Sequence, residues 1–469
     1  MLIHPLLCNT LPPAPCTLLI IGSLDTTLHE YLVMRGYHLI QQMDFTPPAV
    51  PVARVYCLEI GLIKDPLDDF NQLYSALPAQ TAVYLWGTVC IQRQINQLIE
   101  QLPTLSFLLW QIQRCGFKLL AQKDLTTEIS DFSLNPQHYA YIAIELQKTT
   151  PPRWQINQVS EKDSPAIRQL FNQVFTPKIM SEALWTWKYA AGRGIGMAAW
   201  TGTEMVAHYG GILRRILYFG NVKTAVQIAD VMVLSTERGV LTKKGAFFLT
   251  AASFPEYFVG YGAIAWLGYG FPSERHLRLA QHLDLYAPVG RMVELTWQSE
   301  QTPPKLFSRI QHLNLETAEA VITQLWKNMA NSLHTALLGV RDWDYLQYRY
   351  LQHPHNTYEL LLVTHRLTGK PLGLAVIFIE GDICRLMDFI GSPQQLQTTI
   401  AQVRRVAGRR GLTHVSTWIT ENFSTMFPLI DAQQKPLDIQ IPHSIWCQGI
   451  APDVVKNHWW LMAGDTDFL

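Results

Sequence analysis

The stretch DVMVLSTERGVLTKKGAFF (230–248) places cations and glycines in the turn after an apolar run of strand type. The cations are Arg238, Lys243 and Lys244, and the glycines are Gly239 and Gly245. Glycine lets a backbone approach a ligand without a Cβ clash, and turn amides at a helix N-terminus attract anions. These residues are therefore candidates to hold the phosphates of a cofactor. The alternative interpretation is a solvent-exposed, basic helix start.

The composition is that of a folded protein without a strong electrostatic signature. The 469 residues predict about three domains at ~150 residues each. Hydrophobic residues make up 48% and charged residues 16%, which suffices for packed cores. Lys+Arg and Asp+Glu balance at 37 each, so the overall charge does not favour nucleic acid or an anionic membrane as a partner.

The cysteines are scattered and form no CxxC pair, which favours a reducing compartment over a disulfide framework or a zinc site. They are Cys8, Cys16, Cys57, Cys90, Cys115, Cys384 and Cys447. His353 and His355 have no partners at metal-ligand spacing, so no metal site is expected. The N-terminal stretch lacks a cationic leader and is broken by prolines. We expect a soluble cytoplasmic protein.

Two polar, proline-containing stretches, QKTTPPR (147–153) and QSEQTPPK (298–305), have the composition of linkers. They divide the chain into three expected domains, 1–149, 150–300 and 301–469. In the first, short apolar strands such as CTLLIIGS alternate with helical stretches such as TLHEYLVMRG. Strands separated by helices predict an α/β domain with a parallel sheet.

The order of elements in 1–149 resembles the class I S-adenosylmethionine-dependent methyltransferase fold, most clearly in LYSALPAQTAVYLWG, QRCGFKLLAQKDL and YAYIAIEL. The family's glycine-rich turn is here IGSLDTT, with Gly22 as its one glycine. Where the family's ribose-binding acid is expected, the chain has Gln41 and Gln42, with Asp44 nearby. The resemblance therefore implies a degenerate Rossmann-like domain that serves as a scaffold or docking module and does not bind S-adenosylmethionine.

The segment 150–300 begins with two helical stretches and continues as a meander of strands separated by the turn sequences GTE and FGN. A helix is expected from about Lys243 to Ala252. AIAWLGYGF reads as a strand, Ser273 can cap the helix ERHLRLAQHL, and LYAPVGRMVEL reads as a returning strand.

This order, with DVMVLSTERG and GYGFPSERHLRLAQHLDLY as landmarks, resembles the GNAT (Gcn5-related) N-acetyltransferase fold over about 150–295. A fainter copy covers about 335–469. Tyr189 and Tyr350 are 161 positions apart (350 − 189), and Gly211 and Gly373 are 162 apart (373 − 211), which indicates a duplicated domain. The expected fold class is thus α/β (α+β), with a Rossmann-like domain followed by two GNAT-like domains with mixed central sheets.

The resemblance implies acetyl-coenzyme A, or another acyl-coenzyme A, as cofactor. The strand Asp230–Val233, with Met232 and Val233, would bind the pantetheine arm through its backbone. The residues implied for the phosphates are Arg238, Gly239, Val240, Lys243, Lys244 and Gly245. Arg238 and Gly239 match the start of the family motif, whereas Leu241 and Lys243 occupy its next glycine positions.

Acyl transfer to an amine needs a base for the amine and an acid for the departing thiolate. The base candidates are Asp230, His208 and Glu237, although a structural acceptor and a core histidine are the simpler interpretations of the first two. The family's acid is a tyrosine on the last helix, where this chain has Ala280. Tyr286, just past that helix, is a substitute.

No glycine-rich turn follows RLMDFIG in the third segment, so this copy is expected to lack a cofactor. The predicted function is acyl transfer from acyl-coenzyme A to an amine of a small molecule or amino sugar, without nucleic acid or membrane partners. Aminoacyl transfer from charged tRNA is a related possibility that the neutral charge argues against. The alternative is a non-catalytic scaffold or binding protein built from degenerate copies of these folds. The sequence does not indicate the acceptor or the oligomeric state.

Overall fold

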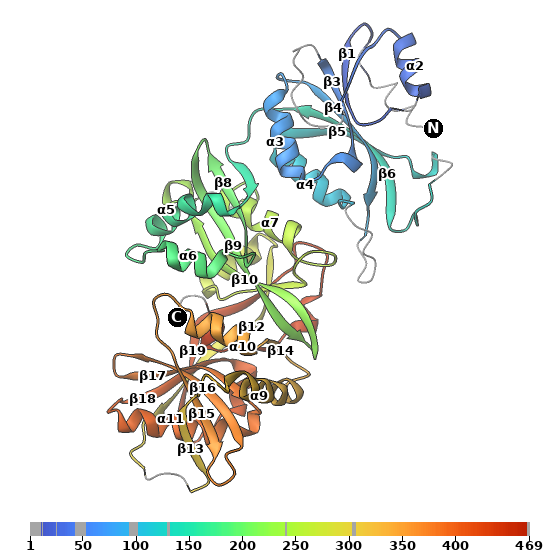
Figure 1. Cartoon of the computed structure of the whole chain (residues 1–469). Helices are drawn as coiled ribbons and strands as arrows, with labels where there is room; N and C mark the ends of the chain where they lie inside the picture. The colour runs from blue at the N-terminus through green and yellow to red at the C-terminus, as the bar shows by residue number, and fades with distance from the viewer. Residues whose placement is uncertain are drawn as a thin grey trace. The chain divides into compact units, whose positions relative to one another are not determined.

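The computed structural model describes residues 11, 13–24, 26–42, 53–92, 102–128, 132–239, 242–302 and 306–466 (Figure 1). Contacts divide the chain into two compact units. One comprises Met1–Gln158 with Met197–Val206, and the other comprises Val159–Gly196 with Ala207–Leu469.

The first unit is built on a six-stranded sheet. Its strands are β1 (Thr17–Ile21), β2 (His38–Gln42), β3 (Ala53–Glu59), β4 (Ala82–Cys90), β5 (Phe117–Asp124) and β6 (Tyr139–Lys148), and its helices are α2 (Thr26–Met34), α3 (Pro66–Ala76) and α4 (Leu105–Arg114). The sheet order is β2-β1-β3-β4-β6-β5, with β2, β1, β3 and β4 parallel and β6 antiparallel to both of its neighbours. β7 (Gln155–Gln158) pairs with Met197–Trp200 of β8 (Gly194–Thr201).

The local sequence explains how these elements begin and why the first strand is central. Asp65 accepts hydrogen bonds from the Leu67 and Asp68 amides, and Pro66 occupies the first turn, so α3 starts with a side-chain cap and a pre-set backbone angle. The run Leu18–Ile21 is buried at every position, as expected for a strand with neighbours on both sides.

The second unit contains two sheets. The first has the order β11-β10-β9-β14-β20. Its elements are α5 (Ser164–Val174), α6 (Glu182–Tyr189), β9 (Glu204–Tyr218), β10 (Asn221–Val233), α7 (Ala246–Phe258), β11 (Leu267–Tyr269), α8 (Glu274–His282), β14 (Leu337–Gly339) and β20 (Trp459–Trp460). β9 and β10 form an antiparallel hairpin, and β11 runs parallel to β10.

The second sheet has the order β13-β15-β16-β17-β18-β12-β19. Its elements are β12 (Tyr286–Gln298), β13 (Ser308–His312), α9 (Ala318–Ser332), α10 (Trp343–Leu346), η5 (Gln347–Leu351), β15 (Glu359–His365), β16 (Pro371–Glu380), β17 (Ile383–Gly391), α11 (Leu396–Arg409), β18 (His414–Thr420), β19 (Ala432–Ser444), α12 (Pro452–Val455) and η8 (Ala463–Asp465). Both sheets of this unit contain parallel and antiparallel pairs, so the expected mixed α/β architecture is confirmed.

The two sheets of the second unit exchange strands. β12 follows α8 in the chain, yet it pairs with β18 and β19 of the second sheet. In return, β14 and β20 extend the first sheet beyond β9. Strand pairing therefore joins the expected segments 150–300 and 301–469. β12 of the earlier segment pairs with β18 of the later one, and β14 of the later segment pairs with β9 of the earlier one.

Helices α6 and α7 cover opposite faces of the first sheet. Consecutive strand residues point to opposite faces. His208 lies against the Tyr189 ring of α6, with ring centroids 6.4 Å apart, whereas its neighbour Tyr209 lies against Phe254 of α7, at 5.2 Å. The first sheet therefore has one face covered by α6 and one covered by α7, and we call these the α6 face and the α7 face.

Among the described residues, no helix is both long and apolar enough to cross a membrane. Within the same residues, His, Cys, Asp and Glu side chains form no group of three or more that could hold a metal ion.

Candidate functional site

β10 and β11 separate after a short stretch of parallel pairing. Ala225, Val226 and Gln227 pair with Leu267, Gly268 and Tyr269. β11 ends there, while β10 continues to Val233. In the described part of the chain, Ile228–Val233 has no ladder partner on the β11 side. The strands therefore diverge beyond Gln227, and we call this region the first gap.

A β-bulge interrupts β10 beside the first gap. The pairing with β9 shifts between Ala229 and Met232, and Asp230 adopts a positive φ of 49°. A left-handed backbone at a residue other than glycine is uncommon and persists only when its surroundings hold it. Bulges re-aim side chains and disrupt the ladder locally. Here the bulge directs Asp230 toward the α6 face.

The Asp230 carboxylate is held by two residues from the end of α6. Lys188 Nζ lies 2.9 Å from Oδ1 and 2.7 Å from Oδ2, and the Tyr189 hydroxyl donates to Oδ2 at 2.5 Å. The exposed fractions of the Lys188 and Asp230 side chains are 4% and 7%. A buried charge pair of this kind needs such additional hydrogen bonds to offset its desolvation. Sequence reasoning did not single out Lys188 or Tyr189, although a lysine among the apolar residues of WTWKY was an available signal.

His208 lies next to Asp230, and the structure thus brings two predicted catalytic residues together. Its Nδ1 is 2.8 Å from the backbone oxygen of Asp230. Burial lowers the pKa of His208 below its usual value, so the neutral ring is favoured at neutral pH. A Cβ on Gly210 would meet Cε1 of the ring at 2.5 Å, and one on Gly196 would meet Nε2 at 3.2 Å. Both glycines therefore make room for the imidazole.

Tyr286, the third catalytic candidate, lies at the start of β12 and not with Asp230. Its hydroxyl accepts a hydrogen bond of 2.7 Å from Tyr209, whose ring faces α7. Both side chains are buried, and burial raises the pKa of each above the usual value for tyrosine. The α7 face thus holds a hydrogen-bonded pair of protonated tyrosine hydroxyls. The sequence did not indicate Tyr209 as the partner of Tyr286.

The predicted phosphate-binding residues follow the end of β10. Met232 is buried within the strand, and Val233, its last residue, accepts a hydrogen bond of 2.9 Å from Arg238 Nε through its backbone oxygen. Gly239 has a φ of +102°, a conformation that favours glycine. Val240 lies outside the described residues.

Lys243, Lys244 and Gly245 lead into α7. Gly245 is the N-cap of this helix and, having no side chain, leaves the first amides without a side-chain cap. Lys243 forms a salt bridge of 2.9 Å with Asp284, whereas Lys244 is exposed and forms no ion pair with the described residues. The cations and the helix start therefore lie at one end of β10, as the sequence predicted, with Lys243 already partnered.

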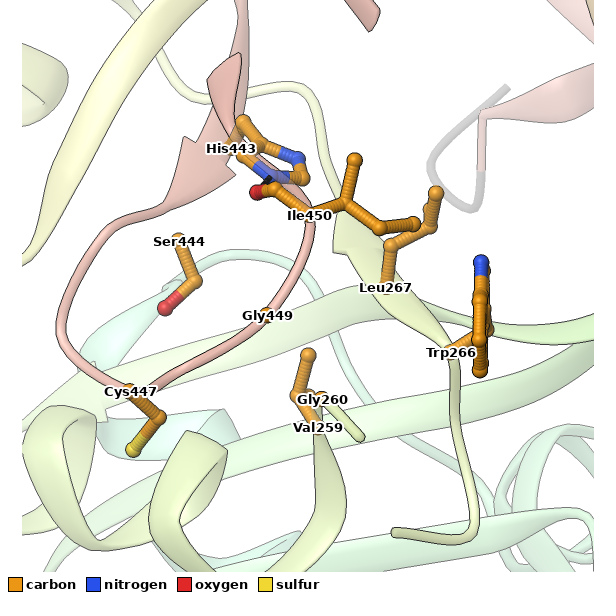
Figure 2. A pocket seen from close by; sticks show the side chains of 9 residues that line it. All are labelled: Val259, Gly260, Trp266, Leu267, His443, Ser444, Cys447, Gly449 and Ile450. Atoms are coloured by element: carbon orange, nitrogen blue, oxygen red, sulfur yellow. Dashed lines mark hydrogen bonds between the residues drawn. The ribbon is translucent and has the colours of Figure 1, made fainter. Parts of the chain in front are cut away.

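A small pocket lies elsewhere in the second unit, between the end of α7, β11 and the segment after β19 (Figure 2). It is lined by Val259, Gly260, Trp266, Leu267, His443, Ser444, Cys447, Gly449 and Ile450. His443 Nε2 is 2.7 Å from the Ile450 backbone oxygen, which ties the segment after β19 to the end of that strand. None of the predicted catalytic or phosphate-binding residues lines this pocket.

No family model matches the chain, and no curated protein matches it. Solved structures do resemble it. A conserved protein of unknown function from Enterococcus faecalis, described as a probable N-acyltransferase, is 12% identical with a TM-score of 0.47, over 62% of this chain and 72% of that one. A GCN5-related N-acetyltransferase from Anabaena variabilis is 13% identical with a TM-score of 0.46, over 63% and 73%. Saccharomyces cerevisiae N-myristoyltransferase is 11% identical with a TM-score of 0.43, over 70% and 86%.

Proposed function

We propose that the chain transfers an acyl group from an acyl-coenzyme A to an amine of a small molecule or amino sugar. The observation that carries this proposal is the divergence of β10 from β11 beside the bulge at Asp230. Backbone amide and carbonyl groups along Ile228–Val233 lack ladder partners on that side among the described residues. The amide-containing arm of coenzyme A can satisfy such groups by lying along the strand.

The end of β10 supports placing the phosphates there. Arg238 and Lys244 supply positive charge, Gly239 permits a close approach, and α7 begins behind Gly245 without a side-chain cap. Uncapped helix amides and the helix dipole attract phosphate. We assign Val240 and Lys243 to the same site, with Met232 and Val233 along the arm.

The proposed reaction uses residues from both faces of the first sheet. The amine nitrogen attacks the thioester carbonyl carbon, a C–N bond forms and the C–S bond breaks. The amine proton passes to a base, and the thiolate takes up a proton from an acid. Asp230 and His208 are the base candidates on the α6 face, and Tyr286, supported by Tyr209, is the acid candidate on the α7 face.

We further propose that residues 1–149, within the first unit, form a degenerate methyltransferase-like domain. Its four parallel strands support the resemblance. Glu59 argues against a ligand at the turn after β1, because its Cβ and Oε2 lie 3.0 and 3.1 Å from where a Gly22 Cβ would be. We expect no heat when the full-length protein is titrated with S-adenosylmethionine.

The main test is calorimetry with coenzyme A. We expect the wild type to bind it and the double variant Arg238→Glu, Lys244→Glu to bind at least tenfold more weakly, because two phosphate-facing cations become anions. Lys327→Glu changes an exposed lysine of α9 and should bind like the wild type. Absence of binding by the wild type would reject the transferase and leave the non-catalytic binding protein.

A further inference from the structure

The hydrogen bonds around the bulge distinguish between the two base candidates. Resting on the proposed function, we propose that His208 Nε2 accepts the amine proton, and that Lys188 and Tyr189 are positioning residues that hold the bulge so that His208 keeps this role.

The first step is the tautomer of His208. The backbone oxygen of Asp230 can only accept a hydrogen bond, so the contact of 2.8 Å requires Nδ1 to carry the proton. In a neutral ring the other nitrogen, Nε2, is then unprotonated and able to accept one. Gly196 lies beside Nε2, where an added Cβ would be 3.2 Å from Nε2 and 2.6 Å from Val159 Cγ2, and His208 is 2% exposed. The proposal therefore requires the amine to reach Nε2 by a local opening beside Gly196 or through one ordered water.

The second step concerns the Asp230 carboxylate. Its Oδ1 is bonded to Lys188, and its Oδ2 is bonded to Lys188 and Tyr189. The side chain is 7% exposed. These three hydrogen bonds and the low exposure leave little room for an amine at either oxygen. The Asp230 side chain is therefore a structural anchor, and its backbone carbonyl is the group that acts on His208.

The third step links the anchor to the base. Asp230 holds a left-handed conformation, with φ of 49°, which is uncommon for a residue other than glycine. The bonds from Lys188 and Tyr189 offset this cost and fix the direction in which the carbonyl points. If either bond is lost, the carbonyl is free to turn away, and Nδ1 loses the acceptor that selects its tautomer.

The groups that face His208 are Lys188 and Tyr189 from α6 and Asp230 from β10. Lys188 disfavours the imidazolium, whereas the charge and carbonyl of Asp230 favour it. Loss of Lys188 therefore has a predictable sign, because the remaining Asp230 charge should raise the pH at which His208 becomes protonated.

The second sheet provides a matched control. Tyr350 lies in the last turn of η5, much as Tyr189 lies at the end of α6, and its hydroxyl donates to Asp388 Oδ2 at 2.9 Å. Asp388 pairs with Val376 beside a register shift between β16 and β17. Tyr350→Phe thus removes the same kind of bond from the other sheet.

The test is nitrogen NMR of the full-length protein labelled in its histidine rings, with the His208 signal assigned from His208→Gln. At pH 7.5 we expect the wild type to show the tautomer protonated at Nδ1. Lys188→Met and Tyr189→Phe should each lose this single tautomer. Lys188→Arg should retain it, and so should Tyr350→Phe. A wild-type ring protonated at Nε2, or an unchanged signal in both Lys188→Met and Tyr189→Phe, would overturn the inference. Tyr189→Phe removes only a hydroxyl and remains informative if Lys188→Met does not fold.

Kinetics with acetyl-coenzyme A and hydroxylamine as the amine probe supply the second readout. We expect kcat to fall about 100-fold in His208→Gln and at least tenfold in Tyr189→Phe, with KM for acetyl-coenzyme A unchanged. The pH profile of Lys188→Met should shift to higher pH. A Tyr189→Phe enzyme with wild-type kcat would overturn the positioning role. If no variant and no wild type binds coenzyme A while the tautomer behaves as expected, the proposed function fails and the positioning network stands.

Discussion

In each sheet of the second unit, two neighbouring parallel strands pair over a short stretch and then diverge. In the second sheet, another segment of the chain occupies the space between them. In the first sheet, β10 pairs with β11 over three positions and then diverges beside a bulge. In the second sheet, β17 pairs with β18 over Ile383, Cys384 and Arg385 and then diverges beside a register shift. We call the second divergence the second gap.

The segment that follows β20, residues 461–466, packs into the second gap. Met462 forms a bridge with Ile419 of β18, and the Thr420 amide donates to the Leu461 backbone oxygen at 3.1 Å. Gly464 lies so near β17 that an added Cβ would be 2.9 Å from the Met387 backbone oxygen. Backbone from elsewhere in the chain thus satisfies the groups that the divergence exposes. The filled second gap is one physical reason for the expectation that the third segment holds no cofactor.

The ion pairs beside the two gaps also differ. At the first gap, Lys188 pairs with Asp230 on one face of the sheet. At the second gap, Arg341 lies between Asp388, at 2.8 Å, and Asp465, at 2.6 Å, and all three side chains are fully buried. A guanidinium can bind two carboxylates through its planar fork, whereas an ammonium is a point charge. At the second gap, Arg341 therefore links β17 to the segment that fills the gap through ion pairs with Asp388 and Asp465. The Lys188–Asp230 pair at the first gap makes no such link.

The largest expected effect comes from breaking the link that Arg341 makes. Arg341→Met should reduce the free energy of unfolding by about 3–5 kcal/mol, because it leaves Asp388 buried without its cation and Asp465 with Arg214 alone, at 4.0 Å. Denaturant unfolding measures this change. Arg341→Lys keeps the charge without the fork and should fall between the variant and the wild type. Wild-type stability in Arg341→Met would show that the second gap is not held by this residue.

A smaller effect is expected from crowding the filling segment. A Cβ on Gly464 would lie 2.0 Å from the Tyr350 hydroxyl, so Gly464→Ala should cost about 1–3 kcal/mol of unfolding free energy. Gly290→Ala in β12 is the control, since its Cβ would lie 3.7 Å from Ile441, an ordinary contact distance. If the two variants unfold at the same denaturant concentration, the segment is not tightly packed in the second gap.

The smallest expected effect is a pH dependence of stability that arises from two histidines packed against α6. Burial lowers the pKa of His208, and it lowers the pKa of His353 to about 4. Their rings contact Tyr189 and Trp187 of α6. Because the unfolded chain binds more protons below about pH 6.5, stability should fall as the pH drops from 6.5 toward the folded pKa values and stay constant above 6.5.

Hydrogen exchange measures where this acid effect acts. After correction for intrinsic rates, the amides of α6 should be less protected from exchange at pH 5 than at pH 7, while those of the segment in the second gap should keep their protection. The variant His208→Gln, His353→Gln removes both titrating rings and should weaken the dependence. Equal acceleration at the two gaps would show that the histidines do not act locally.

The turns, caps and local strands could be predicted from the sequence. The turns GTE and FGN lie where β8 gives way to β9 and β9 to β10, and Ser273 caps α8 by accepting from the His276 amide. The helix expected to end near Ala252 continues to Phe258, with Pro255 inside it. Its extra turn is covered by Trp446, whose Nε1 donates to the buried Glu256 at 2.6 Å, a contact that spans 190 positions.

Of the candidate site, the sequence named Asp230 and His208 as base candidates on either side of the turn FGN, and the hairpin that this turn forms brings them together in the structure. It also placed the glycines and cations after β10. It did not reveal Lys188 and Tyr189 as partners of Asp230, or Tyr209 as the partner of Tyr286. These contacts join residues that are 41, 42 and 77 positions apart, beyond the reach of strand or helix periodicity.

The sequence by itself therefore determined the α/β character, the hairpin of β9 and β10, and the basic glycine-containing turn before α7, since each depends on residues that are close together in the chain. The tertiary structure alone decided that β12 joins the second sheet, that the segment after Trp460 packs into the second gap, and that His208 Nδ1 lies 2.8 Å from the Asp230 backbone oxygen. The physical reason is that strand exchange, gap filling and a side chain's hydrogen-bond partner depend on which distant backbone groups remain unsatisfied once the sheets have formed.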